Sequence, residues 1–242
     1  MTDTSTKSGQ RILIVLEPRH PSTLALAAAA AIAGDSKPQV RGVLIEDENV
    51  RRLGLLTEVR EVTLGTAQIR VPALATLERQ LRVEFREARR LFEGAAAAFA
   101  LVSTFETRQE RAVSQLIRDT SGERLLVIGR AGAPVVRAWW DAELSQLLAA
   151  DVWSLAFVPA ASRGANGIVA YLSDSDADDQ AALMARRIAA RTGMSVRHLH
   201  RRMLGTLQMQ RIYYLVVSSG ATTPSRLREL ILSHTWTVVV TR

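Results

Sequence analysis

The sequence has no cysteine among its 242 residues, and this absence excludes several functions at once. Without a thiol the chain forms no disulfide, presents no cysteine nucleophile and offers no thiolate ligand to a metal ion. The lack of cysteine also fits a reducing compartment, so we expect a cytoplasmic protein. Lysine is nearly absent too, since Lys7 and Lys37 are the only two and arginine carries nearly all of the positive charge.

Long hydrophobic runs are missing as well. The longest stretch of low polarity, residues 24–33, is much shorter than the roughly 20 apolar residues of a membrane-spanning helix, so we expect no membrane span. Residues 1–10 are polar, which predicts a flexible tail and not a signal peptide. With 48% hydrophobic and 23% charged residues, the rest of the chain can bury one large core or two smaller ones.

The net charge of +7 is concentrated in the last third of the chain. Residues 161–242 carry 11 basic and 5 acidic side chains, a balance of +6, whereas residues 1–160 carry 20 and 19, a balance of +1. The basic residues that could contact an anionic surface are Arg186, Arg187, Arg191, Arg197, Arg201 and Arg202. Because they are spread over several elements, we favour a solvated surface over a nucleic-acid or lipid footprint.

The first two thirds of the chain alternate between short apolar runs and helical patterns, which predicts a mostly parallel sheet with helices on both faces. Ser22 and Gly34 are expected to cap and end an alanine-rich helix, and Gly42 indicates a strand against which a helix packs closely. Apolar residues at steps of three and four from Leu74 to Phe99 predict a helix of about seven turns. We interpret it as covering the core, with a partner-binding coiled coil as the alternative. Strands are expected at 11–16, 40–45, 102–107, 125–128 and 153–158, and short helices at 50–62, 112–119 and 142–150.

The pattern restarts after a small, polar segment at 161–167, which we interpret as a linker. Strands are expected at 168–172, 194–200, 212–217 and 236–240, with helices at 177–191 and 224–233. Gly193 is expected to end the first of these helices. We therefore predict an α/β protein of two domains, a complete one at 11–160 and a shortened one at 168–242. Each is expected to have its own open, mostly parallel sheet, five-stranded in the first and smaller in the second. Their final strands should lie against one another and form an internal pseudo-dimer.

Several features of the first unit point to a family. They are the alanine-rich helix after the first strand, the sequence Ile-Glu-Asp-Glu-Asn at 45–49, the long charged helix, and the run from Phe105 to Gly132 that contains Arg-Leu-Leu-Val-Ile-Gly-Arg. On these features the unit resembles the universal stress protein family, and the whole chain is similar to a tandem form of it. The resemblance implies the adenine nucleotide alpha hydrolase-like fold, a role in stress response, and a homodimer as a further expectation.

The resemblance also implies a nucleotide site. Nucleotide-binding members of the family have an acidic residue at the end of the first strand and the pattern G-x2-G-x9-G-(S/T) after the fourth. Glu17 stands at the acidic position, and Gly129 and Gly132 match the first two glycines. The next pair is Ala142–Glu143, which puts a methyl group and a carboxylate where the family has phosphate donors. The implied site for ATP or AMP is therefore degenerate, with Arg137 either a substitute phosphate contact or a solvated residue.

Other candidate residues have simpler interpretations. Packing is favoured over stacking on a base for Trp139 and Trp140. The four aspartates between 174 and 179 suit a helix N-terminus better than a hard-cation site. His198 and His200 alternate on a strand and should face one side, but no further ligand lies nearby in sequence, so we expect no metal site. No nucleophile pattern occurs in the sequence, so we expect no enzyme.

Three functions remain compatible with these residues. The leading hypothesis is a non-catalytic regulatory or adaptor protein of the universal stress type, with a degenerate nucleotide site and an unidentified protein partner. The second is a binder of ATP or AMP, or a weak ATPase, that uses Glu17, Gly129, Gly132 and Arg137. The third is a binder of nucleic acid or lipid surfaces through the basic second unit.

Overall fold

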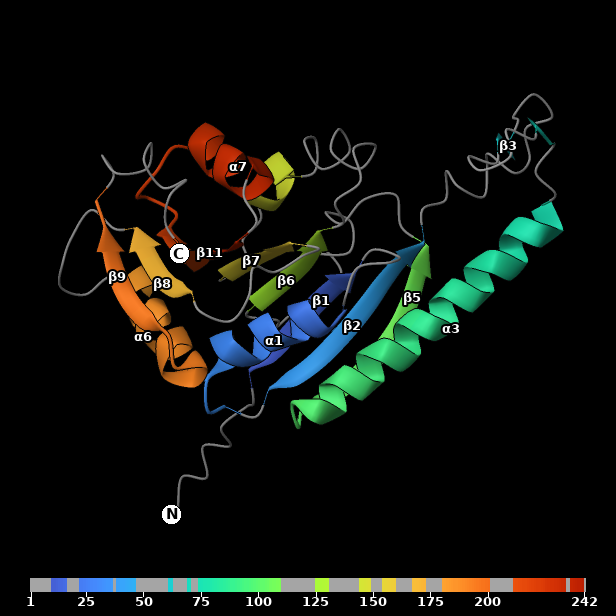
Figure 1. The fold of residues 1–242 in the computed structure, drawn as a ribbon, viewed down its shortest axis with the longest axis horizontal. Coiled ribbons are helices and arrows are strands. Elements are labelled where there is room, and N and C mark those ends of the chain that lie inside the picture. Colours follow the sequence, from blue (N-terminus) through green and yellow to red (C-terminus); the bar gives the residue numbers. More distant parts are fainter. Residues whose placement is uncertain are drawn as a thin grey trace, which may run out of the picture.

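A computed structural model gives the fold of the chain (Figure 1). It describes residues 10–16, 22–36, 38–46, 61–62, 69–70, 74–109, 125–130, 144–148, 154–159, 167–172, 180–200, 211–233 and 236–241. These residues form one nine-stranded sheet, a separate pair of short strands, and helices packed against both faces of the large sheet.

Apart from two short strands at 61–62 and 69–70, the described elements follow the order expected from the sequence. The first unit comprises β1 (Arg11–Leu16), α1 (Ser22–Ala33), β2 (Gln39–Glu46), β3 (Glu61–Val62), β4 (Ile69–Arg70), α3 (Leu74–Ala98), β5 (Val102–Gln109), β6 (Leu125–Arg130) and β7 (Ser154–Pro159). The second unit comprises β8 (Ile168–Leu172), α6 (Gln180–Thr192), β9 (Ser195–Leu199), β10 (Ile212–Ser218), α7 (Pro224–Ser233) and β11 (Thr237–Thr241). Residues 144–148 are also helical.

The nine strands lie in the order β5-β2-β1-β6-β7-β11-β10-β8-β9, so the expectation of two separate sheets is corrected. The two parts join because β7 and β11 pair in antiparallel register, with Phe157 opposite Val238 and Ser154 opposite Thr241. The expected contact between the final strands is thus confirmed. Backbone hydrogen bonds satisfy both edges, which removes the reason to keep two sheets apart.

The two halves of the sheet share one connectivity. Outward from the β7–β11 junction, the first unit has β6, β1 and β2, and the second has β10, β8 and β9. All neighbouring strands within each half are parallel. Only β5, at the far edge beside β2, has no counterpart. The described strands therefore show a pseudo-twofold arrangement with a shorter second half, as the repeated sequence pattern predicts.

Side chains that alternate along the strands build a core on each face of the sheet. In β1, Ile12 and Ile14 belong to the cluster that α1, α3 and α6 cover. Leu13 and Val15 belong to the opposite cluster, which α7 and residues 144–148 cover. Figure 1 shows α7 on the other side of the sheet from α1, as the two clusters require. The sheet is therefore a shared middle layer that positions helices from both units.

Glycine ends the helix that follows the first strand of each unit. Gly34 after α1 has a φ of 64°, and Gly193 after α6 has a φ of 71°. Their backbone N–H groups donate to the carbonyls of Ala30 and Ala189, at 3.2 and 2.8 Å. Only glycine adopts this backbone conformation without strain, so both predicted helix ends are confirmed and have the same physical cause.

The long helix α3 packs through its predicted apolar stripe. Phe92 is fully buried, and Phe85 and Ala88 pack beside it against the α1 side of the core. The ring of Phe92 covers Gly42 of β2, as expected for a glycine beneath a helix. At about 1.5 Å per residue, α3 is roughly 37 Å long, longer than the strands beneath it. Figure 1 shows its first turns extending past the ends of β2 and β5.

Some expectations are corrected and others lie outside the described residues. The short helix predicted at 50–62 is wrong at its end, because Glu61 and Val62 form β3 and pair with Arg70 and Ile69 of β4. Residues 51–60 and 112–119, the tail at 1–9 and the linker residues 161–166 are not described. Within the described residues, no helix is both long enough and apolar enough to cross a membrane.

Candidate functional site

The sheet has two switch points, where connections from neighbouring strands leave in opposite directions. The chain runs from β1 through α1 to β2 on one side, whereas β6, on the other side of β1, leads to β7. The second unit repeats this between β8 and β10. In open α/β sheets, ligands bind outside the carboxyl ends of strands at such points. Because β7 and β11 are antiparallel, the carboxyl ends of the strands in the two halves point in opposite directions. The two switch points therefore lie at opposite ends of the strands.

The first switch point brings together two of the regions chosen from the sequence. β1 and β6 are neighbours, and Val15 pairs with Ile128 one residue before the end of β1. Leu16 and Gly129 therefore stand level at the edge of the sheet, with Gly129 buried beside Val158 of β7. Glu17 follows Leu16 directly in the sequence. Glu17 itself lies outside the described residues, so its place beside Gly129 stays a prediction.

The remaining candidate residues of the first site are not placed. Glu17, Gly132 and Arg137 lie outside the described residues, as do the tryptophans at 139–140 and the pair at 142–143. The helical residues that follow, 144–148, bury Leu144 and Leu147 completely against the α7 side of the core. A helix therefore follows the glycine loop, as in a phosphate-binding unit, but its phosphate contacts stay a prediction.

The second switch point ends in a tightly hydrogen-bonded turn. Ser218, at the end of β10, is opposite Thr241 of β11. The Ser219 N–H donates to the carbonyl of Thr241 at 2.8 Å, and the Ala221 N–H donates to the carbonyl of Ser218 at 2.9 Å. Ala221 and Thr222 are buried. This turn holds the N-terminus of α7 beside the carboxyl end of β10, where a phosphate would be expected.

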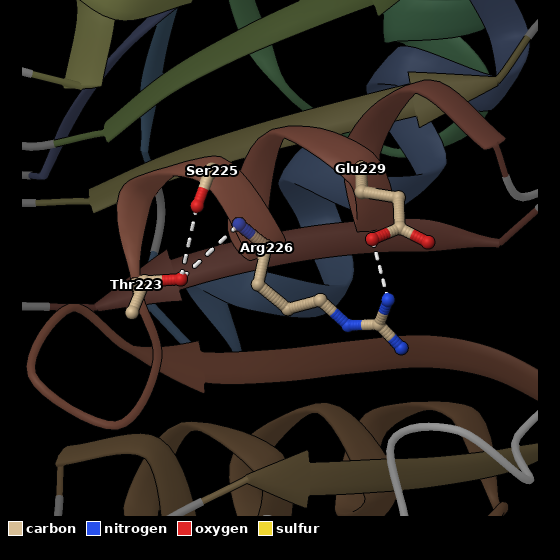
Figure 2. A network of polar contacts seen from close by, with 4 residues as sticks. All are labelled: Thr223, Ser225, Arg226 and Glu229. Atoms are coloured by element: carbon tan, nitrogen blue, oxygen red, sulfur yellow. Dashed lines mark hydrogen bonds and ion pairs between the residues drawn. The ribbon is translucent and has the colours of Figure 1, made fainter.

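Thr223 caps α7 from within the chain (Figure 2). Its hydroxyl oxygen accepts from the Arg226 N–H at 3.4 Å and lies 3.2 Å from the Ser225 hydroxyl. Its carbonyl accepts from the Leu227 N–H at 2.9 Å. The first N–H groups of a helix are the donors that an anion would use. At α7, Pro224 has no N–H to offer, the Arg226 N–H already has the Thr223 hydroxyl as its partner, and the Leu227 N–H makes the first regular helical bond.

The arginine nearest this helix end is neutralised. Figure 2 shows the Arg226 guanidinium directed at the Glu229 carboxylate one turn later, and the two form an ion pair. Both side chains reach solvent, so the pair adds little stability. It does place a carboxylate beside the only basic side chain in the first turn of α7. The second unit thus has a helix end of the phosphate-binding type at which the Thr223 hydroxyl takes one backbone donor and Glu229 pairs with Arg226.

The titratable side chains that the structure describes outside the switch points include two histidines and a buried tyrosine. The described residues contain no group of three or more histidine, aspartate or glutamate side chains that could hold a metal ion. His198 and His200 do face one side, with ring centroids 4.7 Å apart, and His198 stacks on Tyr171. Burial, with a further contribution from Tyr213, raises the pKa of Tyr214, so its phenol stays protonated at neutral pH. These residues have a packing role in this arrangement.

A second concave region lies where α1 meets α6. An open hollow of about 580 Å³ is lined by Gln10, Asp35 and Ser36 on one side and by Arg187 and Arg191 on the other. The stem of Arg187 lies against Gly34, since a Cβ there would come within 3.0 Å of the Arg187 Cγ. The sequence marked Arg187 and Arg191 as basic residues. It held no signal that α1 of the first unit would complete the hollow.

The arginines of α6 differ from those of α3. In α3, Arg89 and Arg90 form ion pairs with Glu93 and Glu87, and the hydrogen bond from Arg90 lowers the pKa of the Glu87 carboxyl. In α6, Arg186, Arg187 and Arg191 have no carboxylate within ion-pair distance, counting every described residue. The charge of α3 is therefore locally balanced, and the charge of α6 is not.

The six basic residues grouped from the sequence do not form one surface. Along β9, His198 packs on Tyr171 under α6, so Val196 shares that side and Arg197 faces the opposite side of the sheet. Residues 201–202 lie outside the described part of the chain. Three arginines of α6 remain together, next to Val196.

Comparisons with known proteins bear on the fold alone. No family model matches the sequence, and no curated protein matches it. A solved structure, the cytoplasmic domain of a prokaryotic cation chloride cotransporter, is similar with a TM-score of 0.54 and 10% sequence identity. The similarity covers 96% of this chain and 95% of that domain. The α/β architecture with its mostly parallel sheet is therefore shared along nearly the whole chain.

Proposed function

We propose that this protein is a non-catalytic regulatory or adaptor protein of the universal stress type, whose nucleotide sites are degenerate. One observation carries the proposal: at the second switch point, Thr223 caps α7 and Glu229 neutralises Arg226. An incoming phosphate would have to displace the cap and would meet a carboxylate. The chain has filled this phosphate position with its own side chains.

The first switch point has a matching departure in sequence. Ala142–Glu143 replaces the family's Gly-Ser, and the carboxylate repels a triphosphate unless a cation intervenes. In the sequence, each unit thus carries a carboxylate shortly after its expected phosphate position, Glu143 in the first unit and Glu229 in the second. A regulatory role needs the sheet and its surfaces, and it needs no reacting group.

The similar solved structure gives the proposal a context. It is the cytoplasmic domain of a transporter, and the similarity covers nearly all of both chains. In that protein, an architecture of this kind is one domain of a transporter. We extend this to the present chain as a proposal: it acts on a partner protein through its surface, and not on a small-molecule substrate.

A working binder of ATP or AMP is the second candidate, and the first switch point favours it. Leu16 and Gly129 stand level at the ends of neighbouring strands, and in the sequence Glu17 follows the first and the rest of the glycine pattern follows the second. A ribose contact from Glu17 and phosphate contacts from Gly132 and Arg137 would suit this arrangement. This candidate needs only the first unit.

Calorimetric titration with ATP and with AMP separates the two candidates. The adaptor proposal expects no binding heat from the wild-type chain at micromolar nucleotide. Heat at micromolar affinity that disappears in Gly132→Val would overturn it and support the nucleotide binder. The matched control is Gly94→Val, because Gly94 lies on α3 with no atom within 4 Å of an added Cβ. Binding that is lost equally in this control would report a folding defect and not a lost site.

A further inference from the structure

The outer face of α6 combines unpaired positive charge with exposed apolar side chains. Arg186, Arg187 and Arg191 have no carboxylate partner among the described residues. On the same helix Leu183 is 50% exposed, and on the neighbouring strand β9 Val196 is 38% exposed. We name these five residues the α6–β9 face. Figure 1 shows α6 and β9 at one end of the sheet, beyond the other helices of that side.

The charge on this face exceeds what the helix itself requires. A cation in the last turn offsets the negative end of the helix dipole, and Arg191 fills that position in α6. Arg186 and Arg187 are additional. Aspartates precede α6 in the sequence, and Arg186 lies six residues, about 9 Å along the axis, beyond the first residue of the helix.

The apolar residues decide which polyanion fits. Binding to the phosphate backbone of a nucleic acid depends on the charge of the arginines, and an exposed leucine does not contribute to it. An anionic lipid surface attracts the arginines and also accepts apolar side chains at the depth of the headgroups. On the helix surface Leu183 lies opposite the buried side of α6, between the directions of Arg186 and Arg187, and it is 50% exposed. That combination favours a lipid surface over nucleic acid.

The hollow beside the face argues against a small free anion. Arg187 and Arg191 line it, but Asp35 lines it too, and the C-terminal ends of α1 and α6 meet there. The carboxylate and the negative helix ends oppose a phosphate ion that enters the hollow. An extended anionic surface instead contacts the guanidinium groups from outside the hollow. The arginines are therefore better placed for an extended surface than for a bound ion.

We propose that the α6–β9 face docks the protein onto an anionic membrane surface, with Arg186, Arg187 and Arg191 facing lipid headgroups and Leu183 and Val196 entering between them. The binding is peripheral and reversible, because it rests on a few charges and two apolar side chains. It goes beyond the regulatory role proposed above and does not depend on the loss of nucleotide binding.

Co-sedimentation of the full chain with vesicles tests the proposal. We expect binding to vesicles of phosphatidylcholine mixed with phosphatidylglycerol, no binding to pure phosphatidylcholine, and a steep loss of binding with added salt. Replacing Arg186, Arg187 and Arg191 together by Gln should weaken the partition roughly 125-fold, at roughly fivefold for each arginine. Leu183→Gln, made in the wild type, should also weaken binding to the anionic vesicles, although it leaves the net charge unchanged.

A charge-matched control keeps the test specific. Arg79, Arg82 and Arg86 of α3 are exposed, and their replacement by Gln removes the same net charge from a distant helix. This variant should bind vesicles like the wild type. Equal loss in both triple variants, or no binding to the anionic vesicles, would overturn the proposal. Binding of duplex DNA that depends on the α6 arginines but not on Leu183 would overturn it as well and assign the face to nucleic acid.

Discussion

Gly42 of β2 lies directly beneath the ring of Phe92 of α3. A Cβ built on Gly42 would stand 2.5 Å from the Phe92 Cζ, closer than any real Cβ contact. Phe92 is fully buried and belongs to the core that α1 also covers. Because Gly42 has no side chain, this contact lets α3 pack close to β2.

Substitutions at this contact should be coupled. Gly42→Ala should destabilise the protein by about 1–3 kcal/mol through overpacking, and Phe92→Ala by about 3–5 kcal/mol through a cavity. The double variant should lose less than the sum, because removal of the ring makes room for the new methyl group. Gly94→Ala on the open side of α3 is the control and should be neutral or slightly stabilising. Urea unfolding measures all four, and strict additivity would contradict the contact.

The register of β7 on β11 can be tested by a disulfide, since the chain has no cysteine of its own. Ser154 and Thr241 are directly opposite one another in the antiparallel pair. Opposite residues have Cα atoms about 4.5–5.5 Å apart, within the range that a disulfide spans. Mild oxidation of the variant with Ser154→Cys and Thr241→Cys should cross-link each chain internally, visible as faster migration on a non-reducing gel. The pair Ser154→Cys and Val240→Cys should not, because neighbouring side chains face opposite sides of the sheet.

Alkaline pH should destabilise the protein through Tyr214. Its burial raises the pKa of the phenol in the folded state above the ordinary value of about 10. The unfolded chain therefore releases this proton first, so the contribution of Tyr214 is complete below about pH 10 and falls as the pH rises above it. Tyr214→Phe should remove that part of the decline. The measurement is the free energy of unfolding against pH for both proteins, and parallel curves above pH 10 would contradict the assignment.

The cap of α7 should be worth a modest amount of stability. Thr223→Ala removes the hydroxyl that accepts from the Arg226 N–H and should cost about 1 kcal/mol, or roughly 2–4 °C in Tm. Thr223→Ser keeps the acceptor and should be close to the wild type. Ser225→Ala loses only a contact with the Thr223 hydroxyl and should change little. A Thr223→Ala variant as stable as the wild type would show that this helix end does not depend on its cap.

Local chemistry explains which elements could be predicted from the sequence. α7 occupies residues Pro224–Ser233 as expected, because proline favours the first helical position and the apolar spacing runs to the end. Gly34 and Gly193 marked the ends of α1 and α6. The two-residue strands β3 and β4 were missed, since so short a pair has no periodicity to detect.

Long-range geometry explains the rest. The repeat predicted that β7 and β11 would meet, but the merger into one sheet depends on their antiparallel hydrogen bonds, which leave no mark in either strand alone. The candidate nucleotide residues were only partly placed: Gly129 stands at the β1–β6 switch point, while Glu17, Gly132 and Arg137 lie outside the described residues. The hollow between α1 and α6 brings together residues from both units, so no sequence window could contain it.

Thermal unfolding with saturating ATP tests the loss of nucleotide binding most directly. A ligand at about 100 times its Kd stabilises a folded protein by about 2.7 kcal/mol, which corresponds to roughly 5–10 °C in Tm for a chain of this size. We predict that the Tm of the wild type does not change with ATP or AMP, with or without Mg²⁺. A rise of that size in the wild type that is absent in Gly132→Val would contradict the account and assign the protein a working nucleotide site.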